Sequence, residues 1–326
     1  MNYPRQLLLL LADGGWHSGE ELASQLGISR TAVWKQLGQL KELLNVECHA
    51  VRGRGYRLPV PIELLDERSI RKSLSPAAKH KLPDIHILDS IASTNSYLMG
   101  KVPEQLTPGL VCVAEQQTEG RGRRGRSWVS PFGHNIYFSM YFRFPLAPAE
   151  LSGISLVAGL AVVLTLKQLG VIDVGLKWPN DILYKDQKLA GLLLEVAGEQ
   201  SGPSNVVVGI GLNINLSKTD AESIDQPWID LKNIPGGESI SRNRIVAGLV
   251  GNLFEMMGQF EKEGLMSLRD MWRQYDLYDG KSIQLQLGDR QISGVHRGID
   301  ESGALLVETE EGIKAYHGGE VSLRLA

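Results

Sequence analysis

Four arginines and three glycines fall within seven residues, 120–126. The glycine spacing matches the dinucleotide-binding fingerprint, which requires that a helix begin inside the segment. Pro131 and a strand-like run over 136–142 follow instead, so this interpretation fails on context. Glycines that let backbone N–H groups approach a ligand, together with guanidinium groups, can bind a phosphate or a carboxylate. A solvated basic loop and a nucleic-acid patch remain the alternatives.

Other catalytic templates do not fit the sequence. It contains no G-x-S-x-G nucleophile elbow. Residues 280–282 resemble the end of a phosphate-binding P-loop, but Tyr275 stands where the first glycine is required. The seven histidines show no H-x-x-x-H spacing, and Cys48 and Cys112 are far apart, so we expect no zinc site.

A second candidate group lies over residues 177–195. Lys177–Asp181 reads Lys-Trp-Pro-Asn-Asp, and Lys188 begins an apolar run that ends at Glu195. A lone lysine is usually a surface residue. An amine at the start of a buried strand, however, would project at the edge of the core.

Two further segments are weak on their own. Ser93–Asn95 follows the apolar run Ile85–Leu88, and by itself this segment indicates a helix N-cap. Gly209–Asn215 is strand-like and contains two glycines, so its backbone could lie against a flat ligand.

The first 58 residues are predicted to form three helices and a hairpin. Ser18 and Glu21 make a capping box, Gly27 permits a tight turn, and Ser29 caps the next helix. Helix, glycine turn and helix is the helix-turn-helix pattern, and the hairpin adds a wing. In that motif the second helix enters the major groove of DNA. The residues expected to face DNA are Ser29, Arg30, Thr31, Lys35, Arg52 and Arg54. A protein-contact role for the winged helix is the alternative.

The remaining pattern predicts an α+β protein with a mainly antiparallel or mixed sheet, because strands and helices alternate irregularly. We expect a winged helix-turn-helix domain over 1–60, a linker over 61–83 with a short helix around Leu64–Leu74, a catalytic domain over 84–274 and a small β domain over 275–326. Leu151–Leu166 is apolar but shorter than the ~20 residues needed to span a membrane, so a buried helix is predicted.

Composition limits the partners. The net charge of −3 excludes a general polyanion binder, and residues 1–58 hold 7 basic and 5 acidic residues, a net of +2. Any nucleic-acid contact must therefore come from a local patch, which favours binding as a dimer on a two-fold related site. The two cysteines suggest no disulfide framework, and the apolar run 7–12 is too short for a signal peptide. A cytoplasmic protein is expected, without membrane contact.

Five segments occur in one order that closely resembles the bifunctional biotin–protein ligase/biotin operon repressor family. They are Ser93–Asn95, Gln117 with 120–125, Lys177–Asp181, Lys188–Gly191 and Gly209–Asn213. The resemblance covers essentially the whole chain. It implies a central mixed α/β domain of the biotin/lipoate ligase type and a C-terminal SH3-like β-barrel. It also implies ATP-dependent formation of biotinyl-5'-AMP and transfer of biotin to a lysine of the biotin carboxyl carrier protein of acetyl-CoA carboxylase.

The same resemblance implies the site residues. Those for biotin are Ser93, Thr94, Asn95, Gln117, Arg121, Gly122, Arg123 and Lys188. Those for ATP and the adenylate are Arg123, Arg124, Arg126, Trp128, Asn180, Asn213, Trp228 and Arg324. Catalysis is assigned to Lys188 and Arg123, and we hypothesise that Asp181 accepts a proton from the acceptor amine. Glu119, an acidic residue directly before the arginine loop, departs from the pattern and could alter loop closure.

The expected cofactors are ATP with Mg²⁺ carried on its phosphates, and biotin as the substrate. With the adenylate as corepressor, the protein would dimerise and bind the operator DNA of biotin synthesis genes. Two rivals remain. One is a non-catalytic biotin-sensing regulator, which the presence of Lys188 and Asp181 disfavours. The other is a ligase for lipoate or octanoate, which the arginine loop and the segment 177–181 disfavour.

Overall fold

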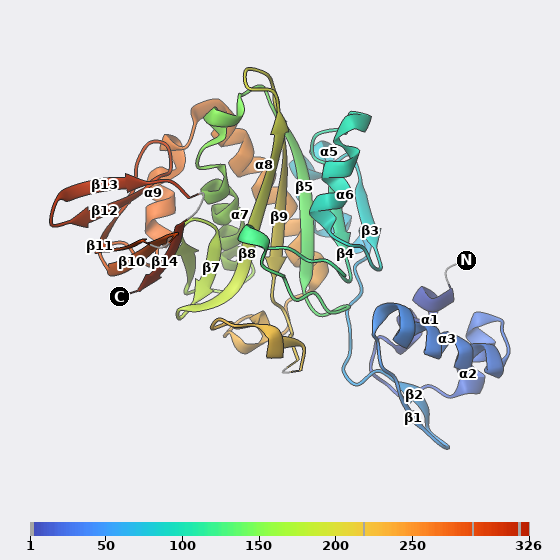
Figure 1. Ribbon diagram of the computed structural model, residues 1–326. Helices are drawn as coiled ribbons and strands as arrows, with labels where there is room; N and C mark the ends of the chain where they lie inside the picture. Colours follow the sequence, from blue (N-terminus) through green and yellow to red (C-terminus); the bar gives the residue numbers. More distant parts are fainter. Residues whose placement is uncertain (1–2, 218, 289, 319–320, 326) are drawn as a thin grey trace.

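The computed structural model describes residues 3–217, 219–288, 290–318 and 321–325. A seven-stranded mixed sheet forms its centre, with a helical domain on one side and a small sheet on the other (Figure 1). The strand order is β3-β4-β5-β9-β8-β7-β6; β3 and β4 are parallel, and the other neighbours are antiparallel. The predicted α+β class with a mixed sheet is confirmed. The strands are β3 (Ile85–Leu88), β4 (Val111–Ala114), β5 (Ile136–Phe144), β6 (Val174–Lys177), β7 (Asp181–Tyr184), β8 (Gln187–Gly198) and β9 (Ser204–Leu212).

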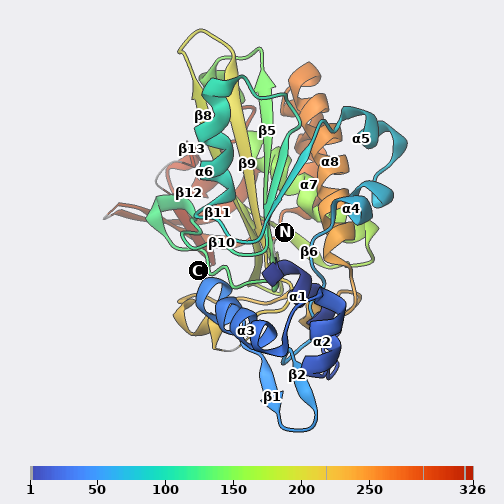
Figure 2. The ribbon, with the colours of Figure 1, turned by 90° about the vertical axis from the view of Figure 1, so that its right-hand side faces the viewer.

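The N-terminal domain has the predicted three helices and hairpin, with the hairpin projecting away from the rest of the molecule (Figure 2). Its elements are α1 (Tyr3–Leu11), α2 (Gly19–Leu26), α3 (Arg30–Leu44), β1 (His49–Val51) and β2 (Gly55–Arg57). Ser18 and Ser29 cap α2 and α3, and Gly27 ends α2 with φ of 66°. A Cβ at Gly55 would lie 2.0 Å from the His17 carbonyl oxygen, so the wing needs glycine there to pair with the chain before α2.

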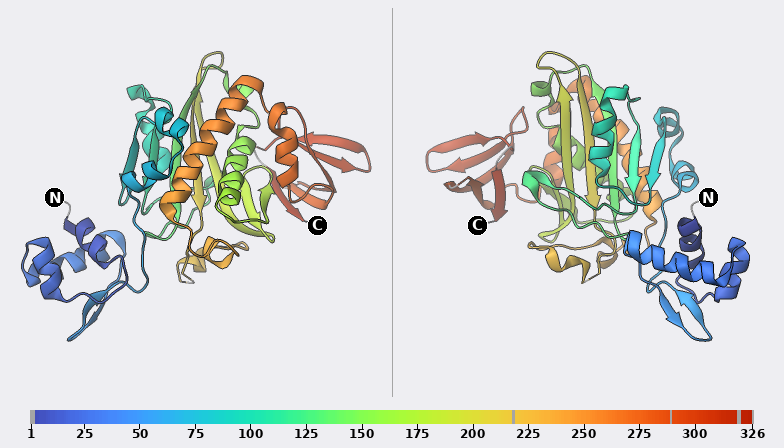
Figure 3. Two further views of the ribbon diagram at one scale, coloured as in Figure 1. Left: turned by 180° about the vertical axis from the view of Figure 1, so that it is seen from behind. Right: turned by 45° about the vertical axis from the view of Figure 1, so that its right-hand side comes forward.

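Two long helices cover one face of the central sheet, and a short helix covers the other (Figure 3). They are α7 (Ile154–Gln168) and α8 (Arg242–Glu263) on the first face and α6 (Thr94–Lys101) on the second. Within the described ranges, Pro148–Gln168 is apolar enough to cross a membrane, but 67% of it is buried inside the protein. It is therefore the core helix that the sequence predicted.

The C-terminal domain is a small antiparallel sheet, as expected. Its order is β13-β12-β11-β10-β14. The strands are β10 (Ser282–Leu287), β11 (Arg290–Ile299), β12 (Leu305–Thr309), β13 (Gly312–Tyr316) and β14 (Val321–Leu325), and α9 (Met266–Tyr275) precedes them. The Trp178 indole N–H donates to the Gly303 carbonyl at 3.0 Å, so this sheet is anchored to the central domain beside the Lys-Trp-Pro-Asn-Asp segment.

The segment 61–83, expected to be a linker with one short helix around Leu64–Leu74, contains two short helices, of which the first confirms that expectation. They are α4 (Glu67–Ser73) and α5 (Pro76–Lys81). Leu65, Ile70, Leu74, Ala78 and Leu82 are buried in the core of the central domain. We propose that the true connection between the domains is limited to residues 59–64.

The N-terminal domain is docked on the central domain as well as connected to it. Phe132, from the central domain, packs in the hydrophobic core of the N-terminal domain. Arg5 of α1 pairs with Asp89 and donates to the Leu65 carbonyl at 2.8 Å. Two of these contact residues, Asp89 and Phe132, lie on the loops that precede Ser93 and follow Trp128 in the chain.

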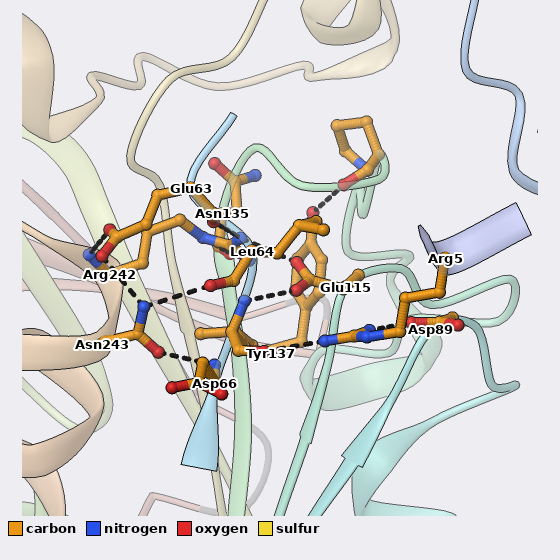
Figure 4. A network of polar contacts seen from close by, with 12 residues as sticks. Arg5, Glu63, Leu64, Asp66, Asp89, Glu115, Asn135, Tyr137, Arg242 and Asn243 are labelled. Atoms are coloured by element: carbon orange, nitrogen blue, oxygen red, sulfur yellow. Dashed lines mark hydrogen bonds and ion pairs between the residues drawn. The ribbon is translucent and has the colours of Figure 1, made fainter. Parts of the chain in front are cut away.

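A buried ion pair holds the end of the connection between the two domains (Figure 4). We call this contact of Arg242 and Glu115 with residues 63–65 the joint. The Arg242 guanidinium lies 2.7 Å from Glu115, and the Leu65 N–H donates to the other oxygen of the same carboxylate at 2.6 Å. Arg242 also donates to the carbonyls of Glu63 at 2.7 Å and Asn135 at 2.6 Å. Both charges are thus fully hydrogen-bonded, as burial requires.

Candidate active site

One cavity of about 680 Å³ opens on the sheet beneath the arginine loop. Every predicted ligase-site residue whose side chain is described lines it. They are Ser93, Thr94, Asn95, Gln117, Arg121, Gly122, Arg123, Arg124, Arg126, Trp128, Asn180, Asp181, Lys188, Asn213 and Trp228. Arg324 lies in β14, but its side chain is outside the described part of the structure. The five sequence segments therefore meet in one place, although up to 120 positions separate them (213 − 93).

The start of α6 is held against the sheet by side-chain hydrogen bonds. Ser93 is the N-cap of α6, so the helix-cap interpretation of this segment is confirmed. Thr94 donates through its N–H to the Gln117 side-chain oxygen at 2.9 Å. Ser139, buried in β5, hydrogen-bonds Asn95 at 2.6 Å and Thr94 at 2.7 Å. The polar groups of this wall of the cavity are thus held in place by one another.

Two glycines of β9 make room for the site. A Cβ at Gly209 would lie 2.1 Å from the Asn95 side-chain oxygen, and one at Gly211 would lie 2.4 Å from the Trp128 ring. Both distances are below van der Waals contact, so any larger residue would displace Asn95 or Trp128. In this structure side chains approach the two glycines, and the prediction that the strand's backbone lies against a flat ligand stays a prediction.

The arginine loop forms a short turn and no helix, which excludes the dinucleotide-binding interpretation. Residues Arg123–Gly125 make one 3₁₀ turn, and Arg124 has φ of 60°. The Gly122 N–H donates to the Arg126 carbonyl at 2.7 Å, and the Trp128 N–H donates to Gly120 at 2.8 Å. The loop is therefore an arch stabilised by its own backbone.

Two arginines of the arch are attached to the cavity walls. Arg123 donates to the Asn180 side-chain oxygen at 2.8 Å and to the Gly318 carbonyl. Arg121 donates to the Ser96 hydroxyl at 2.6 Å. Burial lowers the pKa of Arg123, and the Asp181 carboxylate opposes this shift. A partly desolvated guanidinium interacts more strongly with an anion than a solvated one does.

Lys188 and Asp181 form an ion pair in the cavity. The ammonium lies 2.8 Å from the Asp181 carboxylate and 5.5 Å from the centre of the Trp128 ring. Asp181 lies opposite Gly191 in the antiparallel pair of β7 and β8, whereas Lys188 lies opposite Leu183, so the two charges meet diagonally across this hairpin. Asn213 donates to the Lys188 carbonyl at 3.4 Å from beneath.

The structure adds lining residues that sequence reasoning did not single out. Residues 223–227 form one wall and pair with the start of β8, where the Lys188 N–H donates to the Pro227 carbonyl at 3.0 Å. Phe138, Tyr278 and Leu323 also line the cavity. Burial raises the pKa of Tyr278 to about 12, so its hydroxyl is a neutral hydrogen-bond donor. The alternating apolar pattern of β5 could have indicated Phe138.

The predicted DNA-facing residues are all exposed, on α3, at its N-cap and in the turn of the wing. Arg30, Thr31 and Lys35 are exposed on α3, and Arg52 and Arg54 are exposed in the turn of the wing. The Ser29 hydroxyl accepts from the Ala32 N–H at 3.1 Å, so it serves as a helix cap. Contact of any of these residues with DNA remains a proposal.

Comparison with known families agrees with this arrangement. Residues 87–213 match the biotin/lipoate A/B protein ligase family, residues 280–324 the biotin protein ligase C-terminal domain, and residues 5–57 an HTH domain. The fold and the site thus define the class: a biotin/lipoate-type ligase domain with a helix-turn-helix domain before it and a small sheet domain after it.

Full-length relatives narrow the class. The chain is 42% identical to the bifunctional ligase/repressor BirA of Salmonella typhimurium and 40% identical to that of Escherichia coli, over 99% of this chain and 98% of each relative. The biotin protein ligase of Aquifex aeolicus in complex with biotin and ATP superposes with a TM-score of 0.65 at 31% identity, over 75% of this chain and 100% of that one. The chain belongs to the bifunctional ligase/repressor family of biotin–protein ligases.

Proposed function

We propose that this protein activates biotin with ATP to biotinyl-5'-AMP and transfers the biotinyl group to a lysine of a biotin carboxyl carrier protein. The observation that supports this most is the single cavity in which Arg123, Lys188 and Asp181 meet the polar wall of Thr94 and Gln117. That arrangement has both a recognition surface for a small polar ligand and fixed positive charge for a phosphate.

In the first step a carboxylate oxygen attacks the α-phosphate of ATP, and pyrophosphate leaves. Both reactants are anions, so the site must supply positive charge where charge develops in the transition state. Arg123 and Lys188 are the cavity groups assigned to this role. The hydrogen bond from Arg123 to the Asn180 side chain holds this guanidinium at the cavity wall.

Magnesium is expected to arrive with the nucleotide. In the described ranges, no group of three His, Cys, Asp or Glu side chains could hold a metal ion. Mg²⁺ is commonly bound by one or two carboxylates plus substrate phosphates, and Asp186, which lines the cavity, is a carboxylate that fits that arrangement. When bound, the ion would shield the charge of the departing pyrophosphate.

In the second step the carrier lysine attacks the acyl carbon as a neutral amine, and AMP leaves with the phosphate oxygen. We assign Asp181 to orient that amine and accept its proton. The assignment requires that Lys188 release Asp181, which follows if the adenylate phosphate takes over the Lys188 ammonium. The arginine arch then covers the mixed anhydride and excludes water.

The N-terminal domain supports a second function, repression of biotin synthesis genes with biotinyl-5'-AMP as corepressor. We propose that the adenylate orders the arginine arch, favours a homodimer and thereby places two α3 helices on a two-fold related operator. Such a regulator acts on intracellular DNA, so a cytoplasmic location is proposed with it. Operator affinity should rise when biotin and Mg-ATP are both present; unchanged affinity would exclude this coupling.

The enzymatic part is tested by incubating the purified chain with Mg-ATP and biotin, lipoate or octanoate in parallel. Mass detection of the acyl-AMP should find the biotin adduct alone. An adduct with lipoate or octanoate would keep the mechanism and change the substrate. Tight biotin binding with no adduct from any acid would instead favour a non-catalytic biotin sensor.

A further inference from the structure

Trp34 is the most exposed large apolar side chain in the described part of the chain. It lies in α3 and retains 68% of its surface accessible, although a tryptophan is rarely left in water without a partner. The described residues provide no ring contact or cation–π contact for it. Its indole therefore stands free on the helix that the motif places in the major groove.

The position of Trp34 on α3 matches the side that carries the exposed basic residues. Trp34 is four residues after Arg30 and three after Thr31, and such spacings place side chains next to each other on a helix. Four residues further on, Gly38 leaves open space where its Cβ would be. Trp34 thus lies between Arg30 and the part of the helix surface at Gly38 that has no side chain. The wall of a DNA groove can approach the helix closely at that point.

The charge of this surface selects the class of partner. Arg30, Lys35, Arg52 and Arg54 form no ion pair with any described carboxylate. A second copy of the same surface would place like charges together, which is unfavourable. A polyanion gains from every one of these cations.

We propose that Trp34 reads sequence in the operator by packing against the 5-methyl group of a thymine in the major groove. The inference rests on the proposed DNA-binding function and adds a specificity residue to it. Apolar contact with the thymine methyl is a recognised form of direct readout, and removal of that methyl isolates it. Because four helical residues advance about 6 Å, this thymine lies about two base-pair steps from the base or phosphate that Arg30 contacts.

The test uses the full-length chain with biotin and Mg-ATP. A binding site is first selected from a random duplex library by the wild type. Each thymine of that site is then replaced in turn by deoxyuridine, which removes only the methyl group. The variants are Trp34→Ala and, as a matched control, Leu43→Ala. Leu43 is 65% exposed on the same helix. It lies nine residues, and hence about half a turn around the axis, from Trp34.

At one thymine per half-site, replacement by deoxyuridine should lower the affinity of the wild type about four-fold. This loss corresponds to the ~0.8 kcal/mol that burial of one methyl group contributes. Trp34→Ala should bind the selected site at least ten-fold more weakly and be indifferent to that replacement. Its affinity for non-specific DNA and its salt dependence should equal those of the wild type, because no charge is lost. Leu43→Ala should behave as the wild type.

Several results would overturn the proposal. One such result is that Trp34→Ala selects the same site with the same affinity. Another is that Trp34→Ala loses affinity only to the extent that it loses the dimer in sedimentation, which would show that Trp34 contacts a second copy of the chain. A wild type that selects no sequence would overturn the proposed regulatory function and this inference together. A selected site that Trp34→Ala binds with the affinity of the wild type and with the same sensitivity to deoxyuridine would overturn this inference alone.

Discussion

Two ion pairs of nearly equal length lie in different regions of the molecule. Lys188 and Asp181 are 2.8 Å apart in the ligase cavity, and Arg242 and Glu115 are 2.7 Å apart in the joint between domains. The cavity side chains are 16% and 18% exposed, whereas those of the joint are 4% and 0% exposed. Arg242 and Glu115 use further donors and acceptors on Asn135, Glu63 and Leu65, as Figure 4 shows.

The two ion pairs differ in whether another group can replace one of the partners. An ammonium has three donors, and Lys188 borders an open cavity where a phosphate can replace Asp181. The Arg242 guanidinium is occupied by protein groups on several sides, so it cannot change partner without disrupting the joint. Similar distances therefore describe an exchangeable pair in the site and a permanent pair in the fold.

The largest expected effect follows from loss of the exchangeable pair. Lys188→Ala removes one of the two cations assigned to the transition state, and adenylate formation should fall about 10³-fold. Stability should change by less than about 1 kcal/mol, because the pair is partly solvated. Single-turnover formation of acyl-AMP measures the first value, and urea unfolding measures the second. A variant that is fully active would refute the assignment of Lys188.

Loss of the permanent pair should have the opposite profile. Arg242→Met leaves the Glu115 carboxylate buried without its partner and should lower the free energy of unfolding by about 3 kcal/mol. Adenylate formation per folded molecule should stay within about ten-fold of wild type, far from the Lys188→Ala value. The double variant Arg242→Met/Glu115→Leu is the control, and it should recover much of the stability because no lone charge remains. Equal stability of the wild type and Arg242→Met would contradict this account.

A third buried pair lies where α9 meets the C-terminal sheet, between Asp276 and His296. The His296 Nε2 atom is 3.2 Å from the Asp276 carboxylate, and the Nδ1 atom accepts from the Gly298 N–H at 2.9 Å. Burial raises the pKa of Asp276 to about 7 and lowers the pKa of His296 to about 4. Between about pH 4 and pH 6.5 the folded pair holds one proton, on the aspartic acid. The unfolded chain also holds one, on the histidine, so unfolding takes up no proton.

The smallest expected effect is on the pH dependence of the free energy of unfolding. In the wild type this dependence is absent for the Asp276–His296 pair, because the folded and unfolded states hold the same number of protons. Asp276→Asn leaves His296 neutral in the folded state, while the unfolded state binds a proton below about pH 6.5. The free energy of unfolding of the variant should therefore fall as the pH drops from about 6.5 toward 4, by at most ~1.4 kcal/mol per pH unit. Urea unfolding at pH 7 and pH 5 measures it against the wild type. Parallel curves for the two proteins would rule it out.

The cavity was largely predictable because its residues lie in short local motifs. Residue types that a phosphate site requires occur in Gly120–Gly125, in the segment 177–181 and at Lys188. The order of these segments along the chain indicated the family resemblance, which predicts that they form one site. Tyr278 and Leu323 were not predictable, because they reach the cavity from the C-terminal end through tertiary packing. Residues 223–227 have no regular pattern, so nothing in the sequence indicated that they form a wall.

In the fold, too, elements with local sequence signals were predictable, and contacts between distant residues were not. The winged helix-turn-helix was readable because Ser18, Gly27 and Ser29 are local signals at helix ends. Ser75 and Pro76, an N-cap and the first residue of α5, gave a similar signal that the composition of the segment obscured. The joint could not be predicted, since Arg242 and Glu115 are 127 positions apart and only the assembled fold makes them neighbours.

The central claim is that this cavity makes an acyl adenylate before any acceptor is needed. The most direct test mixes the wild-type chain with biotin and Mg-ATP, follows pyrophosphate in the first turnover, and then adds a carrier domain without more ATP. We predict a burst of about one pyrophosphate per chain, followed by biotinylation of the carrier at the cost of the stored adenylate. Pyrophosphate that appears only after the carrier is added, or a burst of equal size without biotin, would contradict the account.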